Sequence, residues 1–148
     1  MIAMKGLIQR VQHASVEVDG QCIGSIDSGI LLLLGVERND SEEQANKLLH
    51  KVLNYRIFSD ADGKMNESLI QQQKELLVIS QFTLVADTRK GLRPGFSQGA
   101  TPSEGERLYE YFLAQSQKTL PKVASGRFGA DMKVTLCNDG PVTFLLES

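Results

Sequence analysis

Residues 29–36 read Gly-Ile-Leu-Leu-Leu-Leu-Gly-Val, and Ile30–Leu34 is the longest apolar run in the chain. Apolar residues follow one another here without alternation, as in a strand that is covered on both faces. We therefore expect a buried strand over Ile30–Val36. The run is far too short to cross a bilayer, and the sequence has no basic-then-apolar leader, so we expect a cytoplasmic protein with no membrane partner.

Strand signals precede this run. Lys5–Gln12 and Ala14–Asp19 each predict a strand, and the second alternates valine with polar residues. Asp19-Gly20 then predicts a type I′ turn, because glycine tolerates the positive φ that this turn requires. Cys22–Ile26 is expected to pair back as the second arm of a hairpin. His13 is expected to mark a break between the first two strands.

Two amphipathic helices follow the run. Ser41 and Gln44 form a capping box, and the apolar residues after them recur at helical spacing. These residues are Ala45, Leu48, Leu49, Val52 and Leu53. A second helix is predicted to begin at Pro102-Ser103, after a loop over Thr88–Gly99 that is rich in Gly, Pro, Lys and Arg. Further strands are predicted over residues 76–84, 131–138 and 142–146.

This order of elements predicts an α+β fold for residues 1–148 as one domain. The strands are expected to form a mostly antiparallel, barrel-like or two-sheet arrangement with two main helices. A chain of 148 residues can bury a sufficient core without disulfides. Open strand edges favour association, so a homodimer is expected.

Composition excludes several classes of function. The two cysteines, Cys22 and Cys137, are far apart and show no metal-ligand spacing with His13 and His50. We therefore expect two reduced, inert thiols, no metal site and no cofactor. A formal net charge of −2 gives no field for a polyanion, so any nucleic acid must be bound by a local patch. Neither histidine is a clear general base for a catalytic triad.

Two short polar segments stand out. Ser80-Gln81-Phe82-Thr83 ends an otherwise apolar strand, where buried hydroxyl and amide groups need hydrogen-bond partners. The segment 138–143 contains Gly140-Pro141, a dipeptide with a small preference for the trans peptide. From these residues alone, the first segment is best interpreted as a strand end that emerges into solvent, and the second as a turn that links two strands.

Together the two segments resemble the D-aminoacyl-tRNA deacylase family, whose hallmarks are a Ser-Gln-Phe-Thr strand and a Gly-Pro-Val-Thr segment. The similarity covers essentially the whole chain. Further matching segments are Ile8–Val11, Gly35-Val36, Tyr55–Phe58, Gly63–Asn66, Arg93-Pro94, Phe96-Ser97, Gly126–Phe128 and Ala130–Met132.

The resemblance implies a homodimeric hydrolase that cleaves the ester between a D-amino acid, or glycine, and the 3′-terminal adenosine of tRNA. Gly140-Pro141 would be cis and would enter the partner's pocket, where its carbonyl oxygens exclude the side chain of an L-amino acid. Ser80, Gln81, Phe82 and Thr83 would line the floor of that pocket. Arg10 would capture the facing Gly-Pro, and Phe96 and Met132 are candidates for packing the adenine.

Two mechanisms remain open. Thr83 or Ser80 attacks the ester, or backbone N–H groups near Phe82 and Thr83 form an oxyanion hole while the tRNA 2′-hydroxyl helps activate water. Candidates for phosphate contacts are Lys90, Arg93, Lys122 and Arg127, although lone surface cations are common. The rival interpretations are a sibling enzyme that removes L-amino acids and a nucleic-acid-binding dimer without hydrolase activity.

Overall fold

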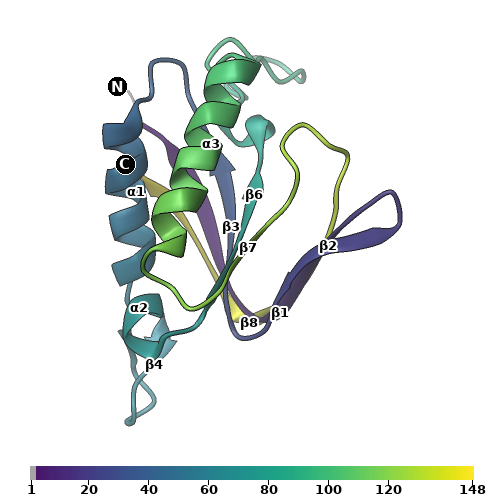
Figure 1. Cartoon of the computed structure of the whole chain (residues 1–148). Coiled ribbons are helices and arrows are strands. Elements are labelled where there is room, and N and C mark those ends of the chain that lie inside the picture. The colour runs from purple at the N-terminus through teal and green to yellow at the C-terminus, as the bar shows by residue number, and fades with distance from the viewer. Residues whose placement is uncertain (1–2) are drawn as a thin grey trace.

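The computed structural model describes residues 3–148, so the first two residues of the predicted domain lie outside the described residues. A curved sheet carries both longer helices on one face (Figure 1). The strands are β1 (Lys5–Val18), β2 (Gln21–Ile26), β3 (Gly29–Gly35), β4 (Phe58–Ser59), β5 (Met65–Glu67), β6 (Glu75–Ser80), β7 (Val123–Ser125) and β8 (Lys133–Glu147). The helices are α1 (Glu42–Asn54), α2 (Leu69–Gln72), the 3₁₀ turn η1 (Phe82–Val85) and α3 (Pro102–Gln117).

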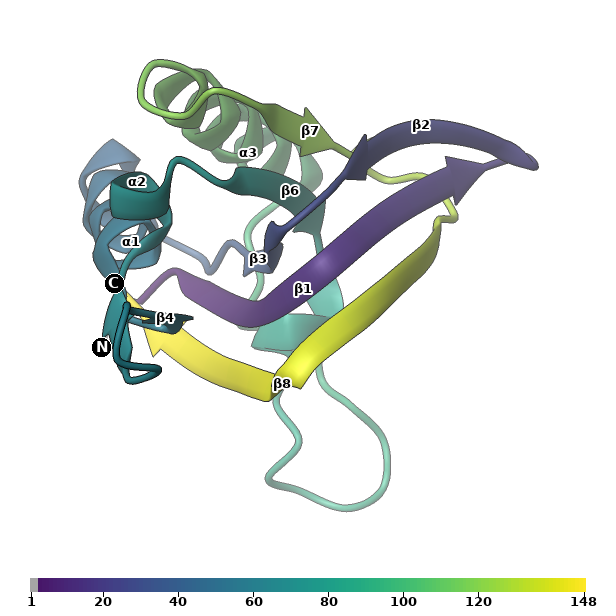
Figure 2. The same ribbon diagram turned by 90° about the horizontal axis from the view of Figure 1, so that it is seen from below.

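The main sheet is mixed and nearly closed. Strand β1 pairs antiparallel with β2 and β3 along one edge and with β8 along the other. Strand β6 pairs parallel with both β3 and β7. The sheet curls until β7 approaches β2, where a Cβ on Gly24 would lie 2.8 Å from the carbonyl oxygen of Ser125 (Figure 2). The predicted barrel-like α+β fold with two main helices is confirmed. Most strand pairs are antiparallel as expected, but both pairings of β6 are parallel, so the sheet is mixed.

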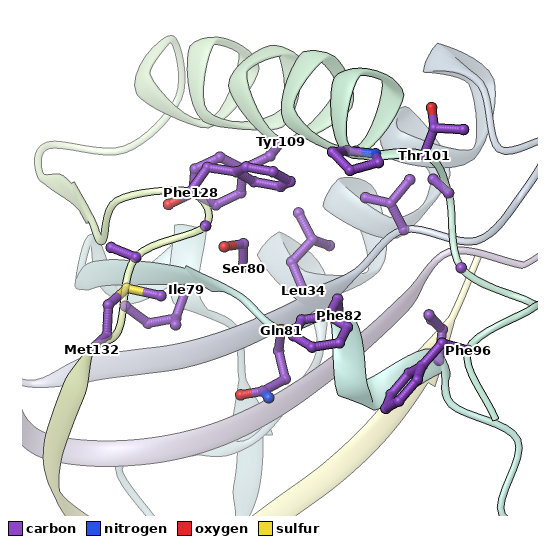
Figure 3. A pocket seen from close by; sticks show the side chains of 18 of the residues that line it. Leu34, Ile79, Ser80, Gln81, Phe82, Phe96, Thr101, Tyr109, Phe128 and Met132 are labelled. Atoms are coloured by element: carbon purple, nitrogen blue, oxygen red, sulfur yellow. The ribbon is translucent and has the colours of Figure 1, made fainter. Parts of the chain in front are cut away.

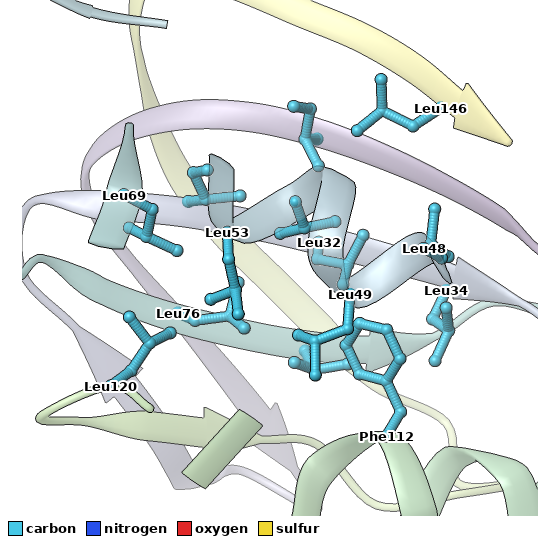
Figure 4. Packing of buried hydrophobic residues seen from close by; sticks show 14 of the residues in the cluster. Leu32, Leu34, Leu48, Leu49, Leu53, Leu69, Leu76, Phe112, Leu120 and Leu146 are labelled. Carbon is cyan, nitrogen blue, oxygen red and sulfur yellow. The ribbon is translucent and has the colours of Figure 1, made fainter. Parts of the chain in front are cut away.

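The central strands β3 and β6 are buried on both faces, as the apolar run predicted. Ile30, Leu32 and Leu34 point toward α1 and α3, where a first hydrophobic cluster packs (Figure 4). Leu31 of β3 and Leu77 of β6 point into the curl of the sheet and belong to a second cluster. A strand with helices on one face and a curled sheet on the other has no solvated face, so its sequence does not alternate.

Helix α1 forms as its sequence predicts. The side-chain oxygen of Gln44 accepts a hydrogen bond from the backbone N–H of Ser41 at 2.8 Å. The five apolar residues predicted for its buried stripe are the five that are buried. The Asp19-Gly20 turn is also confirmed, with φ of 51° and 78°.

Three predicted boundaries are wrong. The two closing strands predicted over residues 131–138 and 142–146 form the single strand β8. Strand β1 runs without a break through His13, although its pairing with β8 shifts on both sides of Val11. Between Gln9 and Val11 the extra residues lie in β8, and between Val11 and His13 the one extra residue is Gln12 of β1. Strand β6 ends at Ser80 instead of continuing to Leu84. Beyond Gln81 the chain tightens into η1, so Phe82 and Thr83 do not belong to the strand that was predicted to contain them. No helix among residues 3–148 is both long and apolar enough to span a membrane.

A buried carboxylate shapes the turn between β3 and α1. Asp40 is 8% exposed and its Oδ2 accepts the backbone N–H of Glu37 at 2.7 Å, while its Oδ1 has no partner among the described residues. Burial raises the pKa of Asp40 to about 6. The same turn binds the chain near residue 99, through hydrogen bonds from Arg38 N to Gln98 O and from Ala100 N to Val36 O.

The Asp40→Asn variant is expected to gain stability relative to the wild type as pH rises. The pKa of Asp40 is raised from 3.8 to about 6 in the folded protein. At pH values above both numbers the ionised carboxylate destabilises the folded protein, and below both numbers the carboxyl is protonated and this cost is absent. Urea unfolding at about pH 4 and about pH 7.5 measures the difference in free energy. Asp62→Asn, in an exposed loop, is the control. An Asp40→Asn difference that is the same at both pH values would contradict the assignment.

Candidate functional site

A cavity of about 550 Å³ opens where β3 and β6 end beneath α3. Its size suits a nucleoside-sized ligand. Figure 3 shows Ser80 on its floor, Tyr109 and Phe128 on one wall, and Phe82 and Phe96 on the other. The lining residues are Leu34, Val36, Ile79, Ser80, Gln81, Phe82, Val85, Phe96, Gly99, Ala100, Thr101, Pro102, Gly105, Tyr109, Phe128, Gly129, Ala130, Asp131, Met132 and Val134.

The floor is set by the end of β6. Ser80 pairs with Leu34 in the parallel register, and the backbone N–H of Gln81 donates to the Leu34 carbonyl at 2.8 Å. The chain then turns over Gly35, where a Cβ would lie 2.8 Å from Cγ1 of Val85. Any larger residue at position 35 would push η1 away from the sheet.

The turn η1 leaves two backbone donors near the cavity. Its first internal hydrogen bond runs from the N–H of Leu84 to the carbonyl of Gln81 at 3.1 Å. The N–H groups of Phe82 and Thr83 precede this bond and therefore have no acceptor within the turn. Such paired N–H groups are the usual donors of an oxyanion hole.

The predicted site residues are brought together in part. Ser80, Gln81 and Phe82 line the cavity, as do Phe96 and Met132. Thr83 does not line it, because the 3₁₀ turn directs this exposed residue elsewhere, and its hydroxyl accepts a hydrogen bond from the Gln81 side-chain amide. The cavity wall therefore depends on η1 and not on a continuing strand.

The two aromatic walls differ in exposure. Phe82 and Phe96 are 69% and 49% exposed, with ring centroids 5.4 Å apart. On the opposite wall, Phe128 is half-buried and packs against Tyr109 at 6.0 Å. Neither Tyr109 nor Phe128 was predicted from the sequence to belong to the site. The signal available for Phe128 was its position in a segment that matches the family.

The cavity offers little acid–base chemistry. The Tyr109 hydroxyl donates to the carbonyl of Val78 at 3.0 Å, and burial raises its pKa to about 12, so it stays neutral. Asp131 is exposed and lies 3.2 Å from Lys133. No histidine is among the described residues that line the cavity. Residues 3–148 also contain no cluster of three His, Cys, Asp or Glu residues able to hold a metal ion.

The second hallmark segment forms a bulge on β8. Gln9 pairs with Thr143 and Val11 with Asn138, so residues 139–142 lie opposite Arg10 alone and protrude. The Gly140-Pro141 peptide is cis, both residues are exposed, and neither lines the cavity of its own chain.

Arg10 and Asn138 hold this bulge. Arg10 Nε donates to the carbonyl of Asp139 at 3.0 Å, and Arg10 Nη1 donates to that of Ile57 at 2.6 Å. The side-chain oxygen of Asn138 accepts the N–H of Val142 at 2.8 Å. A Cβ on Gly140, whose φ is 140°, would lie 2.6 Å from Cγ2 of Val142. Arg10 thus contacts the Gly-Pro bulge of its own chain.

The fold and cavity describe a small α+β protein whose site is built from backbone groups and aromatic walls. A family model described as D-Tyr-tRNA(Tyr) deacylase matches residues 7–147. The chain is 63% identical to a D-aminoacyl-tRNA deacylase of Stutzerimonas stutzeri, covering 98% of this chain and 100% of the relative. It is 62% identical to that of Pseudoalteromonas translucida, covering 97% and 99%.

Two solved structures share the fold. The c-Myc DNA Unwinding Element Binding Protein is 41% identical, with a TM-score of 0.93 and coverage of 97% of this chain and 98% of that chain. A probable eukaryotic D-amino acid tRNA deacylase is 17% identical, with a TM-score of 0.83 and coverage of 99% and 100%. The chain belongs to the D-aminoacyl-tRNA deacylase family. It is a hydrolase that binds tRNA and acts in proofreading.

Proposed function

We propose that the enzyme works as a homodimer in which Gly140-Pro141 of one subunit enters the cavity of its partner. The observation that carries the proposal is the position of the bulge, which is exposed, held by Arg10, and not part of its own cavity. A rigid main-chain projection with no role in its own site is suited to completing the site of a second copy.

The free edge of β8 supports such a dimer. This 15-residue strand pairs with β1 on one side and with no other strand within residues 3–148. Phe144 and Leu145 on it are 39% and 54% exposed, and Tyr55 lies against Phe144 at 5.6 Å. A long strand with an open edge and exposed apolar residues is an association surface unless it is covered.

Chiral selection then follows from exclusion. In the proposed site the carbonyl oxygens of Gly140-Pro141 face the α-carbon of the bound aminoacyl group. A D-amino acid keeps its hydrogen and amino group toward this wall, and its side chain points outward. The side chain of an L-amino acid would overlap main-chain atoms that cannot move aside cheaply. Glycine has no side chain to exclude, so it is also hydrolysed.

For the chemistry, we infer that main-chain groups stabilise the transition state. The N–H groups of Phe82 and Thr83 bind the developing oxyanion, and the 2′-hydroxyl of the terminal ribose helps activate water. Two observations favour this over a protein nucleophile. No histidine lines the cavity among the described residues to activate Ser80, and Thr83 does not line the cavity.

A second candidate function is DNA binding without hydrolysis, favoured by the likeness to the c-Myc DNA Unwinding Element Binding Protein. The net charge of −2 disfavours duplex binding, which requires an extended basic surface. The Ser80-Gln81-Phe82-Thr83 segment, which matches the family hallmark and whose first three residues line the cavity, also favours the hydrolase.

The Gly140→Ala variant is expected to lose chiral selection. Its Cβ would displace Val142 and strain the backbone at a φ of 140°. Hydrolysis of D-tyrosyl-, L-tyrosyl- and glycyl-tRNA measures the effect. The wild type should cleave the D and glycyl esters, and the D-to-L ratio of kcat/KM should fall about tenfold or more in the variant. Gly20→Ala, in the distant β1–β2 turn, is the control. If the D-to-L ratio is unchanged in the variant, another group rejects L-amino acids. If the wild type hydrolyses only the L-tyrosyl ester, the protein is a sibling enzyme that removes L-amino acids.

Thr83→Ala and Ser80→Ala separate the two mechanisms. If main-chain N–H groups and the ribose hydroxyl carry the reaction, each variant should retain kcat within about tenfold of the wild type, because no side-chain nucleophile is lost. Single-turnover hydrolysis of D-tyrosyl-tRNA, with tRNA binding measured in parallel, provides the test. Complete loss of activity with normal tRNA binding in either variant would establish that hydroxyl as the nucleophile.

A further inference from the structure

The loop that follows η1 presents a concentration of positive charge. Residues 88–94 read Thr-Arg-Lys-Gly-Leu-Arg-Pro, and this basic loop carries Arg89, Lys90 and Arg93. Its base is closed by two hydrogen bonds, from Asp87 N to Gly95 O at 2.7 Å and from Gly95 N to Asp87 O at 2.9 Å. The loop between β6 and α3 projects away from the sheet as the pale teal trace below β8 in Figure 2.

The three cations of the basic loop are not equivalent. Arg89 donates to both carboxylate oxygens of Asp87, at 3.0 and 3.2 Å, and this contact lowers the pKa of Asp87 to about 2. Lys90 and Arg93 are exposed and form no ion pair with any described residue. Arg89 therefore stabilises the loop, while Lys90 and Arg93 remain available to an external anion.

The exposed aromatic pair lies between the cavity and this loop. Phe96 lies two residues after the basic loop, and its ring lies beside that of Phe82 at the cavity wall (Figure 3). Exposed aromatic rings next to exposed cations suit a single-stranded nucleic acid, because bases stack on the rings while phosphates bind the cations. The rings of the opposite wall are less available for stacking with bases, because Phe128 packs on the buried Tyr109.

The other candidate cations are less suitably placed. Lys122 lies 3.8 Å from Glu75, at the end of β6 remote from Ser80, so it is far from the cavity floor along that strand. Arg127 is exposed and precedes Phe128 on the opposite wall, which offers no exposed aromatic pair.

We propose that the single-stranded 3′ end of the tRNA leaves the cavity over Phe82 and Phe96, and that Lys90 and Arg93 bind its backbone phosphates. This route rests on the proposed placement of the terminal adenosine in the cavity. It divides recognition into two parts, since the cavity reads the aminoacyl-adenosine and the basic loop binds the phosphates that precede it. Because the two loop contacts are electrostatic, they contribute affinity that salt weakens.

The test compares two substrates with and without phosphates. D-tyrosyl-tRNA and the minimal ester D-tyrosyl-adenosine are hydrolysed by the wild type and by Lys90→Gln/Arg93→Gln, at several salt concentrations. The ratio of kcat/KM for the tRNA to that for the minimal ester should fall in the double variant. The slope of log kcat/KM against log salt for the tRNA should flatten by about 1.4, because each lost single-strand phosphate contact removes about 0.7. Lys64→Gln/Lys118→Gln, on other exposed parts of the chain, is the control with the same charge change.

Each other outcome overturns the route. A double variant that matches the control would show that the loop binds no phosphate. An equal loss on both substrates would mean that the loop acts through the shape of the cavity. If the salt slope for the tRNA flattens in Arg127→Gln and not in the double variant, the RNA leaves the cavity over the opposite wall. Failure of the wild type to hydrolyse either ester would overturn the proposed function as well, which separates that failure from a failure of the route alone.

Discussion

The parallel pairing of β3 with β6 is the constraint on which the rest of the structure depends. It places one hydrophobic cluster against α1 and α3 and a second inside the curl of the sheet, so neither strand can shift without exposing apolar side chains. The pairing also ends with Leu34 beside Ser80, which fixes where the chain must turn. The cavity floor is therefore a consequence of how the core packs.

A second constraint acts on β8, where the four residues 139–142 face Arg10 alone. A strand that is otherwise paired along its length can project a stiff piece of main chain only if side chains satisfy its polar groups. Arg10 and Asn138 provide those partners. The cavity and the bulge are separate in one chain, and the proposed dimer joins them into a single site. The proposed route of the RNA then uses a third surface, the basic loop, which belongs to neither.

Much of the fold could be predicted where local chemistry decides it. The apolar run of β3, the stripe of α1 and the Asp19-Gly20 turn each carry their information within a few residues. The parallel direction of β6 could not be predicted, because it depends on contacts between distant segments. The break predicted at His13 was wrong for a similar reason, because the shifts in pairing there are absorbed as bulges in β1 and in its partner strand β8.

The candidate site shows the same division. The hallmark residues Ser80, Gln81 and Phe82 were found by resemblance and do line the cavity. Thr83 was misplaced because the end of β6 is decided by the Leu34 carbonyl and by the space over Gly35, neither of which is visible from strand periodicity. Tyr109 has the helical spacing of a core residue, and it is one, so nothing in its pattern reveals that it also forms a cavity wall.

Refolding mixed subunits tests the central claim, that each cavity is completed by the partner's bulge, most directly. Gly140→Ala subunits, with an open cavity, are refolded with an about tenfold excess of Ala100→Trp subunits, whose cavity is filled but whose bulge is intact, so that nearly every open cavity faces an intact bulge. The D-to-L ratio of hydrolysis should return to the wild-type value as the excess increases. A ratio that stays at the value of the Gly140→Ala protein at every excess would show that the bulge acts within its own chain and would contradict the account.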